Sequence, residues 1–280
     1  MPNKVLPFSL FRKKYIHTGA CTDPGRIREE NQDSYLCCGS AGLFLVSDGM
    51  GGGEGGGLAS RLVVQFLSKA SLAPMKNLSG VVDLAYQANQ EILDHAAKNH
   101  LRGMGATIVG MILAPFQPTQ GMLFFAGDSP CFRLRDQELT RLTTDHTVAS
   151  AMGIPENQLA KHLQGVLTNA AGCGPNFFLE TRELDIQSHD QYLLCSDGVS
   201  RQLSETEIKQ VLTTGLPAEE KAAALVKAAL VHGGLDNATA VVAAFGPLPE
   251  ITPDVRQEEL ECPDVPVFGK ENEDVTPPTA

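Results

Sequence analysis

The chain has 280 residues, of which 42% are hydrophobic and 20% are charged, which is typical of a soluble globular protein with a sizeable core. Its formal net charge of −11 argues against a nucleic acid or an anionic membrane surface as the main partner. The sequence contains neither an apolar run near the roughly 20 residues of a membrane span nor a C-x-x-C pair among its seven cysteines, so we expect a cytoplasmic protein without disulfides or cysteine zinc sites.

Residues 1–14 are expected to form a flexible N-terminal segment, because their basic cluster follows the apolar stretch, unlike that of a secretory signal. Short runs rich in Val, Phe and Leu predict strands at residues 35–39, 43–47, 106–113, 121–127, 131–136, 138–143, 192–196 and 238–245. Helical patterns occupy residues 57–71, 81–99, 204–212 and 217–234. Strands and helices do not alternate as in a parallel fold, so antiparallel sheets flanked by helices are predicted.

Local signals refine three of these elements and the end of the chain. Residues 131–143 predict a hairpin that turns near Asp136 and Gln137, although the favoured Asp-Gly or Asn-Gly pair is missing. Ser204 and Glu207 have the spacing of a capping box, and Pro217 is placed at a first helical position. Residues 246–280 are rich in proline and acidic residues, which predicts a disordered tail.

Four aspartates lie where predicted strands end or loops begin: Asp48, Asp128, Asp197 and Asp236. Any one Asp-Gly pair is typical of a turn, but four similar placements favour a shared site. Carboxylates that converge repel one another unless a cation neutralises them, and oxygen ligands without His or Cys select Mg²⁺ or Mn²⁺. A pair of such ions would favour hydrolytic chemistry on an anionic substrate.

The glycines that follow Asp48 allow a different interpretation. Residues 51–56 match G-x-G-x-x-G, which would suit a dinucleotide, but the match lacks a conspicuous acidic residue about 20 positions further on. A Walker phosphate loop is excluded, because no Lys-Ser or Lys-Thr pair follows the glycines.

Seven segments occur in an order that resembles a known family: TDPGRIREENQDSY, LFLVSDGMGG, GMGATIVGMIL, FFAGDSPCFRLRDQELTRLTTDHT, VLTNAAGCGP, YLLCSDGVSRQLSETEI and GGLDNATAVV. They are similar to the motifs of the metal-dependent PP2C-type (PPM) serine/threonine protein phosphatases, especially the bacterial branch. The resemblance covers residues 15–245 and implies an α+β fold, an αββα sandwich of two antiparallel sheets with helices outside. It also implies phosphoprotein substrates and an opposing serine/threonine kinase, and we expect a monomer.

The resemblance assigns a binuclear Mn²⁺ or Mg²⁺ site. Asp48 would bridge the two ions and Gly49 would contribute its carbonyl oxygen, so the side-chain-poor sequence after Asp48 is explained by backbone ligation. Asp197 and Asp236 would complete the shell of the first ion.

Three further residues take roles by the same resemblance. Asp33 would hold metal-bound water near the second ion, and Asp128 would bind a third, weaker ion. Arg28 would bind the substrate phosphate, a role that a planar, permanently charged guanidinium suits. A water between the ions held by Asp48 would then attack phosphorus without a covalent enzyme intermediate.

The sequence departs from the family pattern at two positions. Gln32 replaces a frequent Glu, and Gly53 replaces a frequent His, which leaves a catalytically weak binding or sensing module as the alternative function. His146 is expected to have a structural role, since it follows the predicted hairpin. Residues 147–165 match the family's flap, a loop beside the active site in which we expect substrate selection to reside. Cys195 is interpreted as a buried strand residue rather than a nucleophile.

Overall fold

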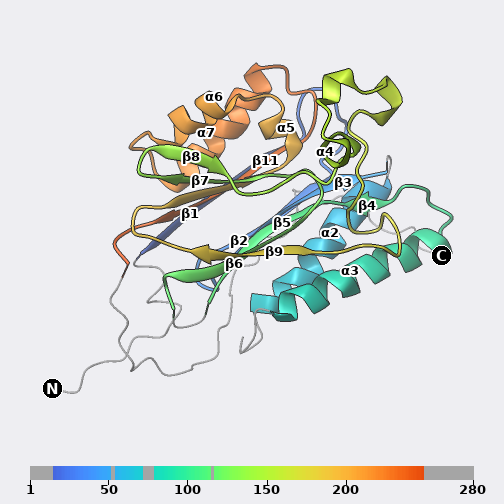
Figure 1. Cartoon of the computed structure of the whole chain (residues 1–280), viewed down its shortest axis with the longest axis horizontal. Coiled ribbons are helices and arrows are strands. Elements are labelled where there is room, and N and C mark those ends of the chain that lie inside the picture. The colour runs from blue at the N-terminus through green and yellow to red at the C-terminus, as the bar shows by residue number, and fades with distance from the viewer. Residues whose placement is uncertain (1–14, 52–53, 72–78, 115–116, 249–280) are drawn as a thin grey trace, which may run out of the picture.

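The computed structural model describes residues 15–51, 54–71, 79–114 and 117–248. Two β-sheets lie face to face between two layers of helices (Figure 1). Every strand pair in the described residues is antiparallel. The predicted αββα sandwich is therefore confirmed.

The first sheet has the strand order β1-β11-β10-β7-β8. Its strands are β1 (Ile16–Asp23), β7 (Cys131–Arg135), β8 (Glu138–Arg141), β10 (Gln191–Cys195) and β11 (Ala238–Phe245). The second sheet has the order β2-β3-β5-β6-β9, and a short β4 pairs with β3. Its strands are β2 (Asp33–Cys38), β3 (Leu43–Met50), β4 (Gly105–Ala106), β5 (Ile108–Leu113), β6 (Gln120–Ala126) and β9 (Glu180–Asp185).

The helices cover the outer faces of the two sheets. On the second sheet lie α2 (Glu54–Ser68), the 3-10 turn η1 (Lys69–Ser71) and α3 (Ser79–Lys98). On the first sheet lie α6 (Glu205–Leu212) and α7 (Ala218–Val231). The capping box of α6 is present as predicted, whereas Pro217 caps α7 and the helix itself begins at Ala218.

Strand β3 shows how the sequence builds these layers. Leu43 and Leu45 pack into the cluster beneath α2 and α3, whereas Phe44 and Val46 pack into the cluster between the sheets. Alternate side chains of a strand point to opposite faces, and here both faces are apolar. The uninterrupted apolar run before Asp48 is therefore a strand at the centre of the sandwich.

The β7–β8 hairpin turns at the predicted place. Asp136 and Gln137 have φ angles of 50° and 65°, and Arg135 pairs with Glu138 across the turn. Positive φ at both central residues is what a tight hairpin turn requires. The predicted turn is confirmed without the favoured glycine.

Strands β1 and β9 were not predicted. β1 pairs with β11 along its whole length but contains small and polar residues such as Thr18 and Gly19. β9 lies at the edge of the second sheet, and most of its side chains are exposed or half-exposed. Neither strand carries the apolar run or clean alternation that identifies a strand in sequence.

Most of the predicted terminal segments, 1–14 and 246–280, lies outside the described residues. Gly246 donates a hydrogen bond to the carbonyl of Tyr15, and Leu248 donates to the hydroxyl of Ser188. Within the described residues no helix is apolar and long enough to cross a membrane. Cys38 is disulfide-bonded, so the prediction of a chain without disulfides is wrong at that position.

Candidate active site

Two strands of the second sheet place Asp33 and Asp48 beside each other. Asp33 begins β2 and is paired with Asp48, near the end of β3, across the antiparallel ladder. Thr107 fixes the backbone of Asp48 through two hydrogen bonds of 2.9 Å. The N–H of Asp48 donates to the hydroxyl of Thr107, and the N–H of Thr107 donates to the carbonyl of Asp48. Directly paired residues point to the same face of a sheet, so both carboxyl groups lie on one face.

Asp33 connects the two sheets. Its Oδ2 accepts hydrogen bonds from the hydroxyls of Ser196 (2.7 Å), just after β10, and Thr239 (2.6 Å), in β11. Its Oδ1 is buried without a hydrogen-bond partner. A buried oxygen that lacks a donor is costly, so this atom offers an acceptor for a water or a cation.

The first sheet contributes Asp197 and Asp236. Asp197 opens the short helix α5 (Asp197–Ser200) after β10, and its carboxyl group is close enough to that of Asp48 for each to influence the other's pKa. Asp236 precedes β11. A Cβ on Gly198 would lie 1.9 Å from the carbonyl oxygen of Asn237, so glycine is required for the backbone after Asp197 to approach the segment that holds Asp236.

Gly49 meets the same requirement on the second sheet. A Cβ there would lie 2.1 Å from the carbonyl oxygen of Gly56, in α2, and 2.6 Å from that of Gln32. Gly49 and Gly56 thus let α2 start against the end of β3. Gly53 lies outside the described residues.

Arg28 borders the cluster from the segment between β1 and β2. A pocket of about 250 Å³ is lined by Arg28, Asp48, Gly49, Asp197 and Asp236, among others. The Nη2 of Arg28 donates a 2.8 Å hydrogen bond to Oδ2 of Asp236, and 56% of the Arg28 side chain is exposed. The guanidinium thus has room to reach a ligand in the pocket.

Asn237 holds the segment that carries Arg28. Its amide nitrogen donates to the carbonyls of Pro24 and Glu30, and its amide oxygen accepts from the N–H of Gln32, all at 2.9 Å. This residue was missed from the sequence, because a single Asn gives no sign of three distant backbone partners.

Asp128 lies beyond the end of β6 and also lines the pocket. Arg201 pairs with both Asp128 and Asp197. As the side chains stand, the described ranges contain no group of three or more His, Cys, Asp or Glu arranged to hold one ion. Arg28, Arg201 and the two hydroxyls on Asp33 engage oxygens that an ion would otherwise use.

The cluster carries excess negative charge. Burial raises the pKa of Asp48 well above its usual range, and repulsion from Asp33, Asp197 and Asp128 raises it further. Burial raises the pKa of Asp33 to about 7 and that of Asp128 to about 6. The pKa of Asp197 is also raised, first by burial and then by Asp236. A hard divalent cation among these oxygens would offset the repulsion and favour the ionised form of the carboxyl groups.

Comparison with known proteins decides the family. The model of the family described as protein phosphatase 2C matches residues 26–232. The chain belongs to the protein phosphatase 2C family. The serine/threonine phosphatase stp of Listeria monocytogenes is 30% identical over 242 residues, which cover 81% of this chain and 95% of that protein. PstP of Mycobacterium tuberculosis is 33% identical over 235 residues, which cover 81% of this chain and 45% of PstP.

Solved structures agree with this membership of the protein phosphatase 2C family. The catalytic domain of PstP in complex with two manganese ions superposes with a TM-score of 0.73 at 30% identity, covering 83% of this chain and 99% of that one. PppA of Pseudomonas aeruginosa superposes with a TM-score of 0.75 at 28% identity, covering 82% and 98%. The antiparallel sheets also rule out the dinucleotide interpretation, which needs a parallel βαβ unit.

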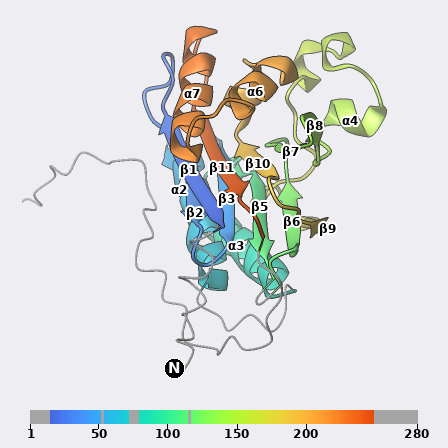
Figure 2. The same cartoon turned by 90° about the vertical axis from the view of Figure 1, so that its left-hand side faces the viewer.

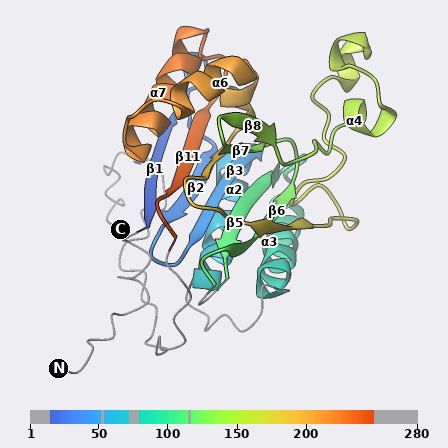
Figure 3. The same cartoon turned by 60° about the vertical axis from the view of Figure 1, so that its left-hand side comes forward.

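Residues 147–165 form the segment predicted as the flap of the protein phosphatase 2C family. They contain α4 (Val148–Met152) and the 3-10 turns η2 (Glu156–Gln158) and η3 (Lys161–Leu163). Figure 2 and Figure 3 show this segment extending from the sandwich at the end where α5 and α6 lie. The short helix and turns were not predicted.

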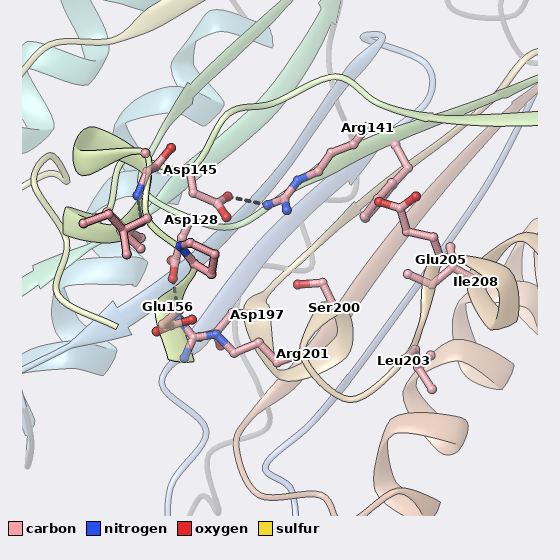
Figure 4. Close-up of a pocket in the computed structure, with 17 residues that line it drawn as sticks. Asp128, Arg141, Asp145, Glu156, Asp197, Ser200, Arg201, Leu203, Glu205 and Ile208 are labelled. Atoms are coloured by element: carbon pink, nitrogen blue, oxygen red, sulfur yellow. Dashed lines mark hydrogen bonds and ion pairs between the residues drawn. The ribbon is translucent and has the colours of Figure 1, made fainter. Parts of the chain in front are cut away.

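A second cavity, of about 590 Å³, opens between this segment and α5 and α6 (Figure 4). The cavity and the smaller pocket share three lining residues, Asp128, Asp197 and Arg201, so the two spaces meet there. Ile154 and Pro155 add apolar surface to the cavity.

His146 has surroundings that match a structural role. Its Nδ1 lies 3.0 Å from the amide nitrogen of Asn169 and accepts from the N–H of Gly127, and its Nε2 lies 3.2 Å from Glu180. The ring also stacks on Phe125 at 5.4 Å between centroids. Both ring nitrogens are therefore engaged at the base of the flap.

Cys195 is fully buried in the strand that precedes Asp197. Burial raises the pKa of its thiol far above the usual range, so it does not supply a thiolate at neutral pH. The thiols of Cys21, Cys37, Cys131 and Cys173 are also free, and burial raises the pKa of each of them.

Proposed function

We propose that this chain hydrolyses phosphoserine and phosphothreonine in proteins with two Mn²⁺ or Mg²⁺ ions. Asp48, the Gly49 carbonyl, Asp197 and Asp236 would hold the ions. The observation that carries this proposal is the convergence of half-buried carboxyl groups with raised pKa from both sheets on one pocket. The two manganese ions of the related PstP structure support the choice of metal.

Bound divalent ions supply Lewis acidity, which lowers the pKa of a shared water and offsets the charge of the phosphate. Asp33 contributes its unpartnered Oδ1 as an acceptor that orients water, and Ser196 and Thr239 fix the carboxyl group through Oδ2. Arg28 leaves Asp236 to donate two parallel hydrogen bonds to the substrate phosphate. Its exposed side chain supports this movement.

The substrate's peptide lies in the larger cavity between residues 147–165 and α6. That cavity begins at Asp128 and at Asp197, which is one of the proposed ligands, and it offers the apolar contacts of Ile154 and Pro155. Loops over a rigid scaffold commonly carry specificity. We further propose that the protein opposes a serine/threonine kinase, because its bacterial relatives are named serine/threonine phosphatases. We also propose that it is a cytoplasmic monomer.

The test is Asp48→Asn in hydrolysis of a phosphothreonine peptide with Mn²⁺. We expect a loss of at least about 100-fold in kcat/KM, because the substitution removes a charged ligand shared by both ions. Asp83→Asn is the matched control, since Asp83 is exposed on α3 and far from the pocket in the fold. Equal rates for the two variants would refute the assignment. Feeble Mn²⁺ binding together with feeble turnover in the wild type would refute the proposed hydrolysis itself.

A further inference from the structure

Arg201 joins two of the acidic residues from different parts of the fold. It follows α5, four residues after Asp197, and its Nε lies 3.0 Å from Oδ2 of Asp197. Its Nη2 donates a 2.9 Å hydrogen bond to Oδ2 of Asp128, which follows β6 of the other sheet. One guanidinium thus bridges the two carboxylates, as Figure 4 shows.

We infer that the Arg201 guanidinium takes the place of a third divalent ion between Asp128 and Asp197, so that the chain binds two ions rather than three. The inference rests on the proposed two-ion function and departs from the family resemblance, which predicts a third, weaker ion at Asp128. The residues around Asp128 do not fit that ion, because one oxygen of each carboxylate that would bind it, Oδ2 of Asp128 and Oδ2 of Asp197, already faces a permanent cation.

The chemistry of the two cations explains the exclusion. A guanidinium presents several N–H donors in a fixed plane and bonds two carboxylates at once. A divalent ion would need the same oxygens at roughly 2.0–2.2 Å and would be repelled by the nearby positive charge. Arginine keeps its charge at every pH at which the protein folds, so loss of a proton does not remove the cation from this position.

The local structure holds Arg201 in this position. Its backbone N–H donates to the carbonyl of Asp197 at 2.8 Å and closes the last turn of α5. Glu156 of the flap adds a third acidic group to its electrostatic surroundings. The side chain is 45% exposed, and its charged end lies where the smaller pocket meets the larger cavity. Arg201 therefore also links the flap to the proposed metal ligands.

The experiment counts Mn²⁺ ions per chain by equilibrium dialysis followed by elemental analysis. We expect two ions for the wild type and three for Arg201→Gln, because the substitution removes the charge and frees the oxygens of Asp128 and Asp197. Arg201→Lys should stay at two ions, since it keeps a cation. Arg102→Gln is the charge-matched control, because Arg102 is exposed between α3 and β4, and it should also bind two.

The double variant Asp128→Asn/Arg201→Gln should return to two ions, which locates the gained ion. Arg201→Gln that stays at two ions while circular dichroism shows a folded chain would overturn the inference. If Arg201→Gln does not fold, the wild type is compared with Asp128→Asn instead. Three ions in the wild type and two in Asp128→Asn would contradict the inference. Two ions in both proteins would support it. A wild type that binds no Mn²⁺ would instead overturn the proposed function and, with it, the inference.

Discussion

Gly49→Ala tests whether close backbone approach builds the site. The new Cβ would lie 2.1 Å from the carbonyl oxygen of Gly56, about 1.3 Å inside ordinary contact, which begins at 3.4 Å. The carbonyl oxygen of Gln32 blocks it on the other side at 2.6 Å. Both obstacles are backbone atoms, so β3 must move relative to α2 or β2. No rotamer change can relieve the clash.

The expected cost follows from this overlap. Overpacking of this kind destabilises a protein by about 1–3 kcal/mol, and for a domain of this size each kcal/mol lowers Tm by roughly 2–4 °C. A shift of about 1 Å at Asp48 would lower turnover by about 100-fold. Two assays are needed: thermal unfolding followed by circular dichroism without metal, and hydrolysis of a phosphothreonine peptide with Mn²⁺.

Gly80→Ala is the control. Gly80 lies near the start of α3, and a Cβ there meets nothing within 4 Å. Alanine favours helix over glycine by about 0.5–1 kcal/mol, so Tm should stay or rise while activity is retained. If Gly49→Ala matched Gly80→Ala in both Tm and activity, close approach at Gly49 would have no role in the site.

Arg28→Ala should lower kcat/KM by about 100-fold, and Arg28→Lys should restore it only in part, because lysine cannot form two parallel bonds to phosphate; full rescue by lysine would count against this reasoning. Burial raises the pKa of Asp33 from 3.8 to about 7, so the folded metal-free protein binds more protons than the unfolded chain between these values, and its Tm should fall as the pH rises from about 4 to about 7 and then level off. Asp33→Asn should weaken that fall, and an unchanged pH dependence would contradict the burial effect. His146→Ala should destabilise the fold by about 1–3 kcal/mol and leave the pH profile of kcat/KM unchanged, since the ring is engaged in structural bonds; the loss of one limb of that profile would instead assign His146 to catalysis.

The sequence predicted the residues whose role follows from their immediate neighbours in the chain. Asp48 and Asp197 each follow an apolar run and precede a glycine, and their half-buried position at strand ends follows from that pattern. The turn at Asp136 and the cap at Ser204 likewise depend on neighbours in the chain. These features need no knowledge of which strands pair.

The missed residues depend on pairing between distant segments. Thr239 reaches Asp33 across 206 positions and Ser196 across 163, because β10 and β11 lie beside each other and face β2. Before that topology is known, one hydroxyl resembles any other. Arg201 shows the same limit: its spacing from Asp197 was visible, but its contact with Asp128 requires both sheets to be in place.

The central claim is that acidic residues from both sheets hold a pair of divalent ions at Asp48. Anomalous diffraction at the manganese edge, from crystals of the wild-type chain grown with Mn²⁺, tests it most directly. We predict two peaks roughly 3.5–4 Å apart, both within coordination distance of Asp48, with Asp197 and Asp236 beside one of them. A map with no peak near the Asp48 carboxyl group would contradict the account.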